Sequence, residues 1–337
     1  MGTAGILGLD IGGANLKAAT PDGRAVSVPF ALWKQPDRLP AALAELVARF
    51  PDAAELAVTM TGELCDCFET KRQGVDAILD ATEHAAAGRP VRVWGTDGAF
   101  HSVAESRANH LTVAAANWHA LATFAGRFAP FGGAVVLVDV GSTTTDVIPV
   151  LDCRPVTIGR TDTTRLEAHE LIYTGVRRTP LCAILKWAAA AEFFATTHDV
   201  HVILGNTPEN PEDTDTADNR PATRSFALSR IARMQGGDAE TMHASALVSL
   251  AEYVQEQQTE QIKIGVRWAI ARLKEKHQQL CPQAVVCGSG AFLARAALAR
   301  CPGLRGEAVE LVDALGPAVS ACAPAYAVAV LAAEGRA

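Results

Sequence analysis

Two segments that lie far apart in this chain repeat one pattern: a run of apolar residues, an aspartate, and then glycines mixed with small polar residues. The first runs from Ile6 to Lys17 and the second from Val135 to Asp146. In each we expect a buried strand, a tight turn and a second strand. Because glycine lets backbone N–H groups come close to an anion, each turn is a candidate phosphate-binding loop. The repetition predicts a duplicated α/β fold in which the two turns face each other across a cleft and hold a phosphate chain from both sides.

Both apolar runs end at an aspartate, Asp10 in the first segment and Asp139 in the second. A carboxylate at the end of a strand can hold Mg²⁺ directly or through water, so we expect these two residues to lie near a divalent metal. A third strand and glycine turn, with Gly288, Ser289 and Gly290, follows late in the chain. One such turn is weak evidence of phosphate binding, because glycine turns are common, but three in this order are much more specific.

The composition limits the class of protein. The 337 residues, 49% of them hydrophobic, are enough for two domains that each bury a core. We place these domains at 1–131 and 132–337, because the loop 129–133 carries proline and two glycines. A well-mixed net charge of −7 argues against general nucleic-acid binding. Because no basic and apolar leader precedes the first strand, we expect a cytoplasmic protein with no membrane segment. Its eight cysteines lack the spacing of a zinc site, so we expect reduced thiols.

Apolar spacing and capping signals predict the remaining elements. We expect strands at 55–60, 91–94, 147–156 and 201–204. Helices are expected at 39–50, 71–87, 114–128, 165–173, 180–194, 224–235 and 238–278, and a buried terminal helix at 318–333 is expected to pack back onto the first domain. The segment 206–219 is rich in Pro, Asp, Glu and Thr and lies between helices, so we expect an ordered ligand loop or lid there.

Five further segments carry a more specific resemblance. They are MTGELCD at 60–66, AANW at 115–118, GRTDTTRL at 159–166, ELIYTGVRRTP at 170–180 and TADNRPAT at 216–223. With the three glycine turns they make the chain resemble the acetate kinase, sugar kinase, heat-shock and actin superfamily. Within it, the chain is similar to the hydantoinase/oxoprolinase-like branch and its aryl–furan ether synthases of methanofuran and methylofuran biosynthesis. The resemblance covers most of the chain and implies an α/β fold of two ribonuclease-H-like, actin/sugar-kinase-type domains that flank a central cleft.

The resemblance also implies an enzyme, a transferase that forms an aryl ether. Such an enzyme joins an aminomethylfuran-methyl diphosphate to the phenol of a glutamylated tyramine, or of a tyrosine, and releases pyrophosphate. The furan stabilises the cation that remains when diphosphate leaves, so the enzyme must neutralise the departing charge and exclude water. We expect Mg²⁺ at Asp10 and Asp139 to do so together with Lys17 and the turn N–H groups.

Further residues are expected to bind the diphosphate, or a nucleotide, through turn N–H groups, hydroxyls or forked guanidinium groups. They are Gly12, Gly13, Asn15, Lys17, Gly141, Ser142, Thr143, Thr144, Thr145, Arg160, Arg177, Arg178, Gly288, Ser289 and Gly290.

The phenol must lose its proton as it attacks, and its ordinary pKa of about 10 makes a nearby base useful. Asp146, Glu63 and Asp66 are candidates for this base, and the sequence does not rank them. Lys17 is a further candidate for a catalytic role, at the departing diphosphate.

Two more pairs are candidates for substrate recognition. Asn117 and Trp118 belong to the resemblance, so we expect them to contact the acceptor. Asp215 and Asp218 could bind the substrate's aminomethyl cation, although a solvated acidic loop is the competing interpretation.

Two other functions stay open from the sequence. In one, the chain is an ATP-dependent small-molecule kinase or a hydantoinase/oxoprolinase-type hydrolase, and the glycine motifs bind ATP. In the other, it is a nucleotide-sensing regulator of the actin-like kind. Release of pyrophosphate without ADP distinguishes the ether synthase from these. The sequence also leaves open the choice of tyrosine or tyramine, the preferred metal, and a homodimer through the long helix at 238–278.

Overall fold

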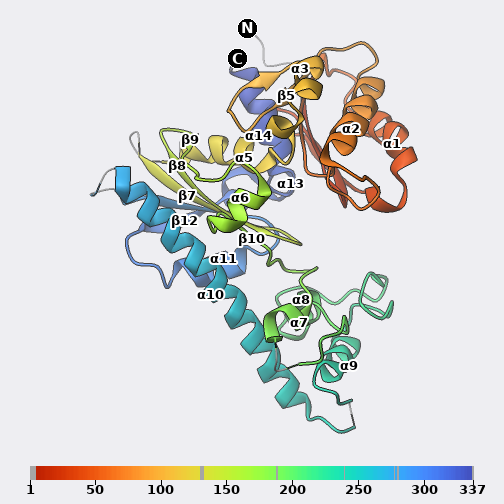
Figure 1. Cartoon of the computed structure of the whole chain (residues 1–337), viewed down its shortest axis with the longest axis vertical. Coiled ribbons are helices and arrows are strands. Elements are labelled where there is room, and N and C mark those ends of the chain that lie inside the picture. The colour runs from red at the N-terminus through yellow and green to blue at the C-terminus, as the bar shows by residue number, and fades with distance from the viewer. Residues whose placement is uncertain are drawn as a thin grey trace. The chain divides into compact units, whose positions relative to one another are not determined.

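The computed structural model describes residues 5–129, 133–186, 189–238, 240–276, 278 and 281–335 (Figure 1). The chain divides into two compact units, each discontinuous in sequence. Unit 1 consists of Met1–Val135, Ile148–Arg165 and Val309–Ala337, and unit 2 of Val136–Val147 and Leu166–Ala308. The predicted boundary between residues 131 and 132 lies outside the described residues.

A six-stranded sheet forms the centre of unit 1, with the order β3-β2-β1-β4-β5-β6. Strand β1 pairs antiparallel with β2 and parallel with β4, so the first glycine turn joins two neighbouring strands. Nearly all side chains of β1 and β4 are buried, as is typical of central strands covered on both faces. The strands are β1 Ile6–Ile11, β2 Asn15–Ala19, β3 Ala25–Pro29, β4 Glu55–Met60, β5 Val91–Trp94 and β6 Phe100–His101.

Side chains alternate along β1, and each of its two faces meets different helices. Leu7, Leu9 and Ile11 share a core with the apolar stripes of α1 and α2. On the other face, α14 packs against β1 and β4 and also against α5, as predicted for a terminal helix that returns to the first domain. The helices of this unit are η1 Leu32–Lys34, η2 Pro36–Arg38, α1 Leu39–Val47, α2 Lys71–Ala86, α3 Val103–Ala108, α4 His110–Val113, α5 Asn117–Ala125, η3 Gly126–Phe128, α12 Leu311–Leu315, α13 Pro317–Ala321 and α14 Ala323–Ala333.

A second sheet repeats the order of the first. Its strands follow the order β10-β8-β7-β11-β12, and β9 also pairs with β8. In both sheets the strand before the glycine turn lies between its hairpin partner and a later strand of the chain. This repeated order is that of ribonuclease-H-like domains of the actin and sugar-kinase type, so the fold class is the predicted one. The strands are β7 Ala134–Val140, β8 Thr145–Leu151, β9 Arg154–Pro155, β10 Leu171–Ile172, β11 Gln283–Cys287 and β12 Arg305–Glu310.

The long helix α10 organises the rest of unit 2 (Figure 1). It packs against α7, α8, α9 and α11, and its buried residues Leu247, Ala251 and Val254 join the core of this region. The helices are α6 Asp162–Glu167, which extends from unit 1, α7 Leu181–Leu185, α8 Thr197–Ile203, α9 Arg224–Met234, α10 Ala244–Lys276 and α11 Ala291–Leu298.

Three predicted elements differ in the structure. The strand expected at 201–204 is wrong, because these residues end α8, whose start is fixed by a capping box between Thr196 and Asp199. The helix expected at 165–173 is interrupted, since α6 ends at Glu167 and β10 pairs with β8. The helix expected at 180–194 ends early, at Leu185.

The helices were also compared with the length of a lipid bilayer. Within the described ranges, none combines the length and the apolar character needed to cross one.

The contact between β1 and α14 generates a stability prediction. A Cβ atom on Gly8 would lie 1.9 Å from the carbonyl oxygen of Ala325 and 2.9 Å from the Cβ of Ala329. Gly8→Ala should therefore lower the free energy of unfolding by about 1–3 kcal/mol through overpacking, measured by urea denaturation. The control Ser27→Ala, at an exposed position of β3, should change it by less than about 0.5 kcal/mol. Equal stability of the two variants would contradict this account of the contact.

Candidate functional site

The first glycine turn is packed closely against the loop that follows β4. The N–H groups of Thr61 and Gly62 both donate to the carbonyl of Ile11, at 3.0 and 3.1 Å. A Cβ on Gly13 would lie 2.6 Å from the Sγ of Cys65. A side chain on Gly13 would therefore displace the Cys65 thiol, and the hydrogen bonds to the Ile11 carbonyl tie the end of β1 to the loop after β4.

Asp10 lies at the base of this turn and is 4% exposed. Its Oδ2 is 3.8 Å from Lys17 Nζ, and its Oδ1 is buried with no hydrogen-bond partner. Burial raises the pKa of this carboxyl, while Lys17 acts in the opposite direction. The strand register places Lys17 and Thr59 beside Asp10, and the Thr59 hydroxyl is also buried without a partner. Unpartnered buried oxygens are costly, so these atoms fit a ligand that supplies positive charge.

A divalent cation is one such ligand. Among the described residues, no group of three or more His, Cys, Asp and Glu side chains is placed to hold a metal by itself. Asp10 supplies one carboxylate of the kind that Mg²⁺ accepts, and a bound Mg²⁺ would take its other ligands from phosphate oxygens and water.

In unit 2 the second and third glycine turns meet. A Cβ on Gly288 would lie 2.4 Å from Asp139 Oδ1, and the N–H of Gly290 donates to the Val140 carbonyl at 2.8 Å. The Gly141 N–H closes the second turn on the Thr144 carbonyl at 2.9 Å. The structure thus gathers Asp139 and both predicted turns at one end of the second sheet.

Glu63 is the buried acid of the loop after β4. It is 1% exposed, and its Oε2 has no hydrogen-bond partner. Burial raises the pKa of Glu63 to about 7, although backbone N–H groups and the charge of Lys71 act in the opposite direction. Lys71 is itself paired with Asp162 at 2.9 Å, and the Asp162 charge also raises the pKa of Glu63. Its carboxyl is thus poised between its charged and neutral forms near pH 7.

Three of the segments that carry the family resemblance meet around Glu63. The backbone of Ala115 adjoins it and has a left-handed φ of 48°, which costs a non-glycine residue about 1–2 kcal/mol. Arg165 places its guanidinium 4.0 Å from the centre of the Trp118 ring. Arg165 and Trp118 are only 1% and 2% exposed, so this pair belongs to the buried packing of the region. Sequence reasoning missed Arg165 and Lys71, and the only signal for Arg165 was its place in a resembling segment.

Arg177, Asp215 and Asp218, which the sequence predicts as site residues of unit 2, each take part in an ion pair. Arg177 binds both carboxylate oxygens of Asp213, at 2.7 and 2.8 Å, and also contacts Asp215. This hydrogen bond from Arg177 lowers the pKa of Asp213. The fully buried Arg230 binds Asp218 at 2.9 Å. These pairs hold the acidic loop 206–219 in place.

The remaining predicted residues lie at defined positions. Asp146 is half-buried on β8 opposite Leu171, and Asp66 is exposed. Asn117 accepts a hydrogen bond from the Trp118 N–H at 2.7 Å. The Gly12 N–H donates to the Asn15 carbonyl, and the hydroxyls of Ser142 and Thr143 are 3.4 Å apart. Thr145 is buried at the start of β8, where its hydroxyl donates to the Thr174 carbonyl at 2.7 Å. Arg160 and Ser289 are exposed, and the Arg178 N–H donates to the Ser142 carbonyl.

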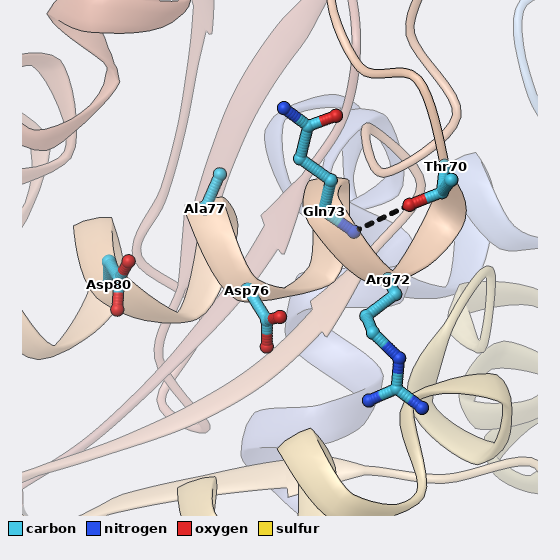
Figure 2. Close-up of a pocket in the computed structure, with 6 residues that line it drawn as sticks. All are labelled: Thr70, Arg72, Gln73, Asp76, Ala77 and Asp80. Atoms are coloured by element: carbon cyan, nitrogen blue, oxygen red, sulfur yellow. Dashed lines mark hydrogen bonds between the residues drawn. The ribbon is translucent and has the colours of Figure 1, made fainter.

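A surface hollow on α2 lies outside these groups (Figure 2). Figure 2 shows Thr70 at the start of the helix, where its Oγ1 accepts the Gln73 N–H at 3.2 Å. The lining residues are Thr70, Arg72, Gln73, Asp76, Ala77 and Asp80. None of them is a predicted site residue, so we assign no function to this hollow.

Known proteins resemble the chain at several levels. A relative from Methanocaldococcus jannaschii is 32% identical over 338 residues, which cover 97% of each chain. It is named as the synthase of a (furan-2-yl)methanamine whose phenoxymethyl group carries a γ-L-glutamylaminoethyl chain. A relative of the same name from Methanococcus vannielii is 28% identical over 206 residues, 58% of this chain and 89% of its own.

A solved structure gives a comparison of the fold. The structure entitled "PilM-PilN type IV pilus biogenesis complex" is 11% identical, covers 98% of each chain and has a TM-score of 0.50. At this identity the likeness concerns the fold alone. The model of the hydantoinase/oxoprolinase family matches residues 55–334. Since this match spans most of the chain, the protein belongs to the hydantoinase/oxoprolinase family.

Proposed function

We propose that this protein is an aryl ether synthase of methanofuran or methylofuran biosynthesis. It transfers an aminomethylfuran-methyl group from its diphosphate to the phenol of a glutamylated tyramine, or of a tyrosine, and releases pyrophosphate. The observation that carries this proposal is the 32% identity, over 97% of both chains, to a relative named as the synthase of such a phenoxymethyl furan. The substrates are accordingly small molecules.

The diphosphate needs groups that accept negative charge as the C–O bond breaks. The glycine turns of the two units offer backbone N–H groups for this purpose, and Lys17 adds a cation beside Asp10. In unit 1, Asp10 is the residue that would hold Mg²⁺, through its Oδ1, which has no hydrogen-bond partner. Asp139 is the corresponding carboxylate of unit 2. When bound, this ion would neutralise charge on the leaving diphosphate.

Glu63 is our candidate for the base that takes the phenol proton. A general base works best when its pKa lies near the operating pH, and burial brings the pKa of Glu63 to about 7. Its unpartnered Oε2 is available to accept a proton. Lys71 and Asp162 are the charged groups that face it. The other two candidates lack this combination of burial and an unpartnered oxygen, since Asp66 is exposed and Asp146 is half-buried.

The direct test is to incubate the protein with Mg²⁺, the furan diphosphate and tyramine- or tyrosine-type phenols. We expect an ether product by mass spectrometry and one pyrophosphate per product.

Asp10→Ala should lower pyrophosphate release by about 100-fold or more, since it removes charge stabilisation from the leaving group. Formation of ADP from ATP, with no ether product, would reject the proposal in favour of a kinase or hydrolase.

The base assignment predicts a pH dependence. Because Glu63 must be ionised to accept a proton, kcat/KM of the wild type should rise with pH and level off above about 7. Glu63→Gln should lower kcat/KM by roughly 100- to 10,000-fold and remove this rise. The matched control Asp66→Asn, at an exposed position of the same loop, should keep both. If Glu63→Gln retained the wild-type profile, another group would be the base.

The same pKa predicts a stability effect that needs no substrate. The pKa of this carboxyl is 4.5 in the unfolded chain and about 7 in the folded protein. The folded state therefore holds the proton more tightly, and the stability that this contributes below pH 4.5 is lost as the pH rises toward 7. Glu63→Gln stays neutral and avoids this loss. The free energy of unfolding of Glu63→Gln, relative to that of the wild type, should therefore increase by on the order of 3 kcal/mol from pH 5 to pH 8. A difference that is constant over this range, in denaturant titrations, would argue against the raised pKa.

A further inference from the structure

A short segment of unit 2, residues 174–178, lies against the second glycine turn; we refer to it as the strap. The N–H of Val176 donates to the Gly141 carbonyl at 3.0 Å, and the N–H groups of Arg177 and Arg178 both donate to the Ser142 carbonyl at 3.0 Å. In a trans peptide the C=O and the following N–H point in opposite directions. The strap therefore turns the N–H groups of Ser142 and Thr143 away from itself.

The strap is held from α10 by Gln258, which is fully buried. Its Nε2 donates to the Thr174 hydroxyl at 2.8 Å and to the Gly175 carbonyl at 3.0 Å. Thr197 adds a second donor to the Gly175 carbonyl at 2.8 Å. Both N–H groups of the Gln258 amide are thus directed at the strap.

His201 completes this network. Because the Gln258 amide nitrogen is used as a donor, its Oε1 must accept, and His201 Nε2 lies 3.0 Å from it. His201 therefore carries its proton on Nε2, and its Nδ1 accepts from Asn206 at 3.4 Å. Burial lowers the pKa of His201 to about 4, which keeps the ring in this neutral form.

Gln258 occupies a position where packing alone would favour an apolar residue. One turn before and one turn after it on α10, Val254 and Ile262 are fully buried. Burying an amide costs free energy unless all its groups are hydrogen-bonded. The hydrogen bonds of the Gln258 amide lead to the strap and to His201, so the amide's role is to hold the strap.

We propose that Gln258 and His201 are positioning residues of the anion site. Through the strap they fix the carbonyls of Gly141 and Ser142, and in this way aim the N–H groups of the turn at a diphosphate. The inference rests on the proposed function, because it takes pyrophosphate as the ligand of this turn. The ion pair of Arg177 and Asp213 also connects the strap to the acidic loop 206–219.

The test compares Gln258→Met with Thr259→Val. Met fills the volume of Gln but cannot donate to the strap. Thr259 is its buried neighbour, and its hydroxyl donates to the Gln255 carbonyl within α10 at 2.9 Å, so Thr259→Val is the matched control. We expect Gln258→Met to weaken Mg²⁺–pyrophosphate binding roughly 10-fold by calorimetry. The KM for the diphosphate should rise while the KM for the phenol is unchanged, and Thr259→Val should match the wild type in each.

A milder variant keeps the test decisive if Gln258→Met does not fold. Thr174→Val removes only the hydroxyl that Gln258 binds, and should weaken pyrophosphate binding about 3-fold. Wild-type affinity in a folded Gln258→Met or in Thr174→Val, or an equal loss in Thr259→Val, would overturn the inference. If the wild type itself bound no pyrophosphate, the proposed function would fail and this inference with it. The wild-type measurement therefore distinguishes the two failures.

Discussion

Close packing of neighbouring segments against the glycine turns is the constraint on which both units depend. Gly13 lies against the Cys65 thiol, Gly175 against the Ser142 backbone, and Gly288 against the Val140 carbonyl, each so closely that a Cβ atom would collide. Backbone N–H groups of neighbouring segments also donate to carbonyls of the turns, as the N–H of Leu32 does to the carbonyl of Gly13. A turn fixed in this way cannot adapt to an anion after it arrives. Its N–H groups must already be oriented, which is what makes electrostatic stabilisation of a leaving group effective.

The buried acids of the chain fall into two kinds. Asp199 is paired with Arg230 at 2.7 Å in a fully enclosed ion pair, so its burial is compensated within the protein. Asp10 and Glu63 are buried to a similar degree, yet each keeps an oxygen with no hydrogen-bond partner. A buried carboxyl oxygen without a partner is costly unless it holds a proton or binds a ligand. Asp199 is thus compensated by Arg230, whereas Asp10 and Glu63 each keep one oxygen that a ligand or a proton could satisfy.

Local signals in the sequence predicted the turns and most central elements, such as the strands at 55–60 and 91–94. They failed at 201–204, because the three apolar residues that follow His201 form too short a run to show a period. The capping pair of Thr196 and Asp199 was the signal that distinguished helix from strand. Glu63 was named from the sequence but could not be ranked, since burial depends on contacts with distant segments. The pair of Lys71 and Asp162, 91 positions apart, is of the same kind.

The segments that carry the family resemblance divide between the two units. Those around Glu63 form a buried acid with a pKa near neutrality, and those around Arg177 and the strap fix the second turn. Turns alone would bind any phosphate chain, whether ATP or a furan diphosphate. Ether formation also requires the phenol to lose a proton when the C–O bond forms. A carboxylate with an ordinary pKa would accept this proton poorly. Under the proposed function, the burial of Glu63 is the feature that suits this carboxyl to accept the phenol proton.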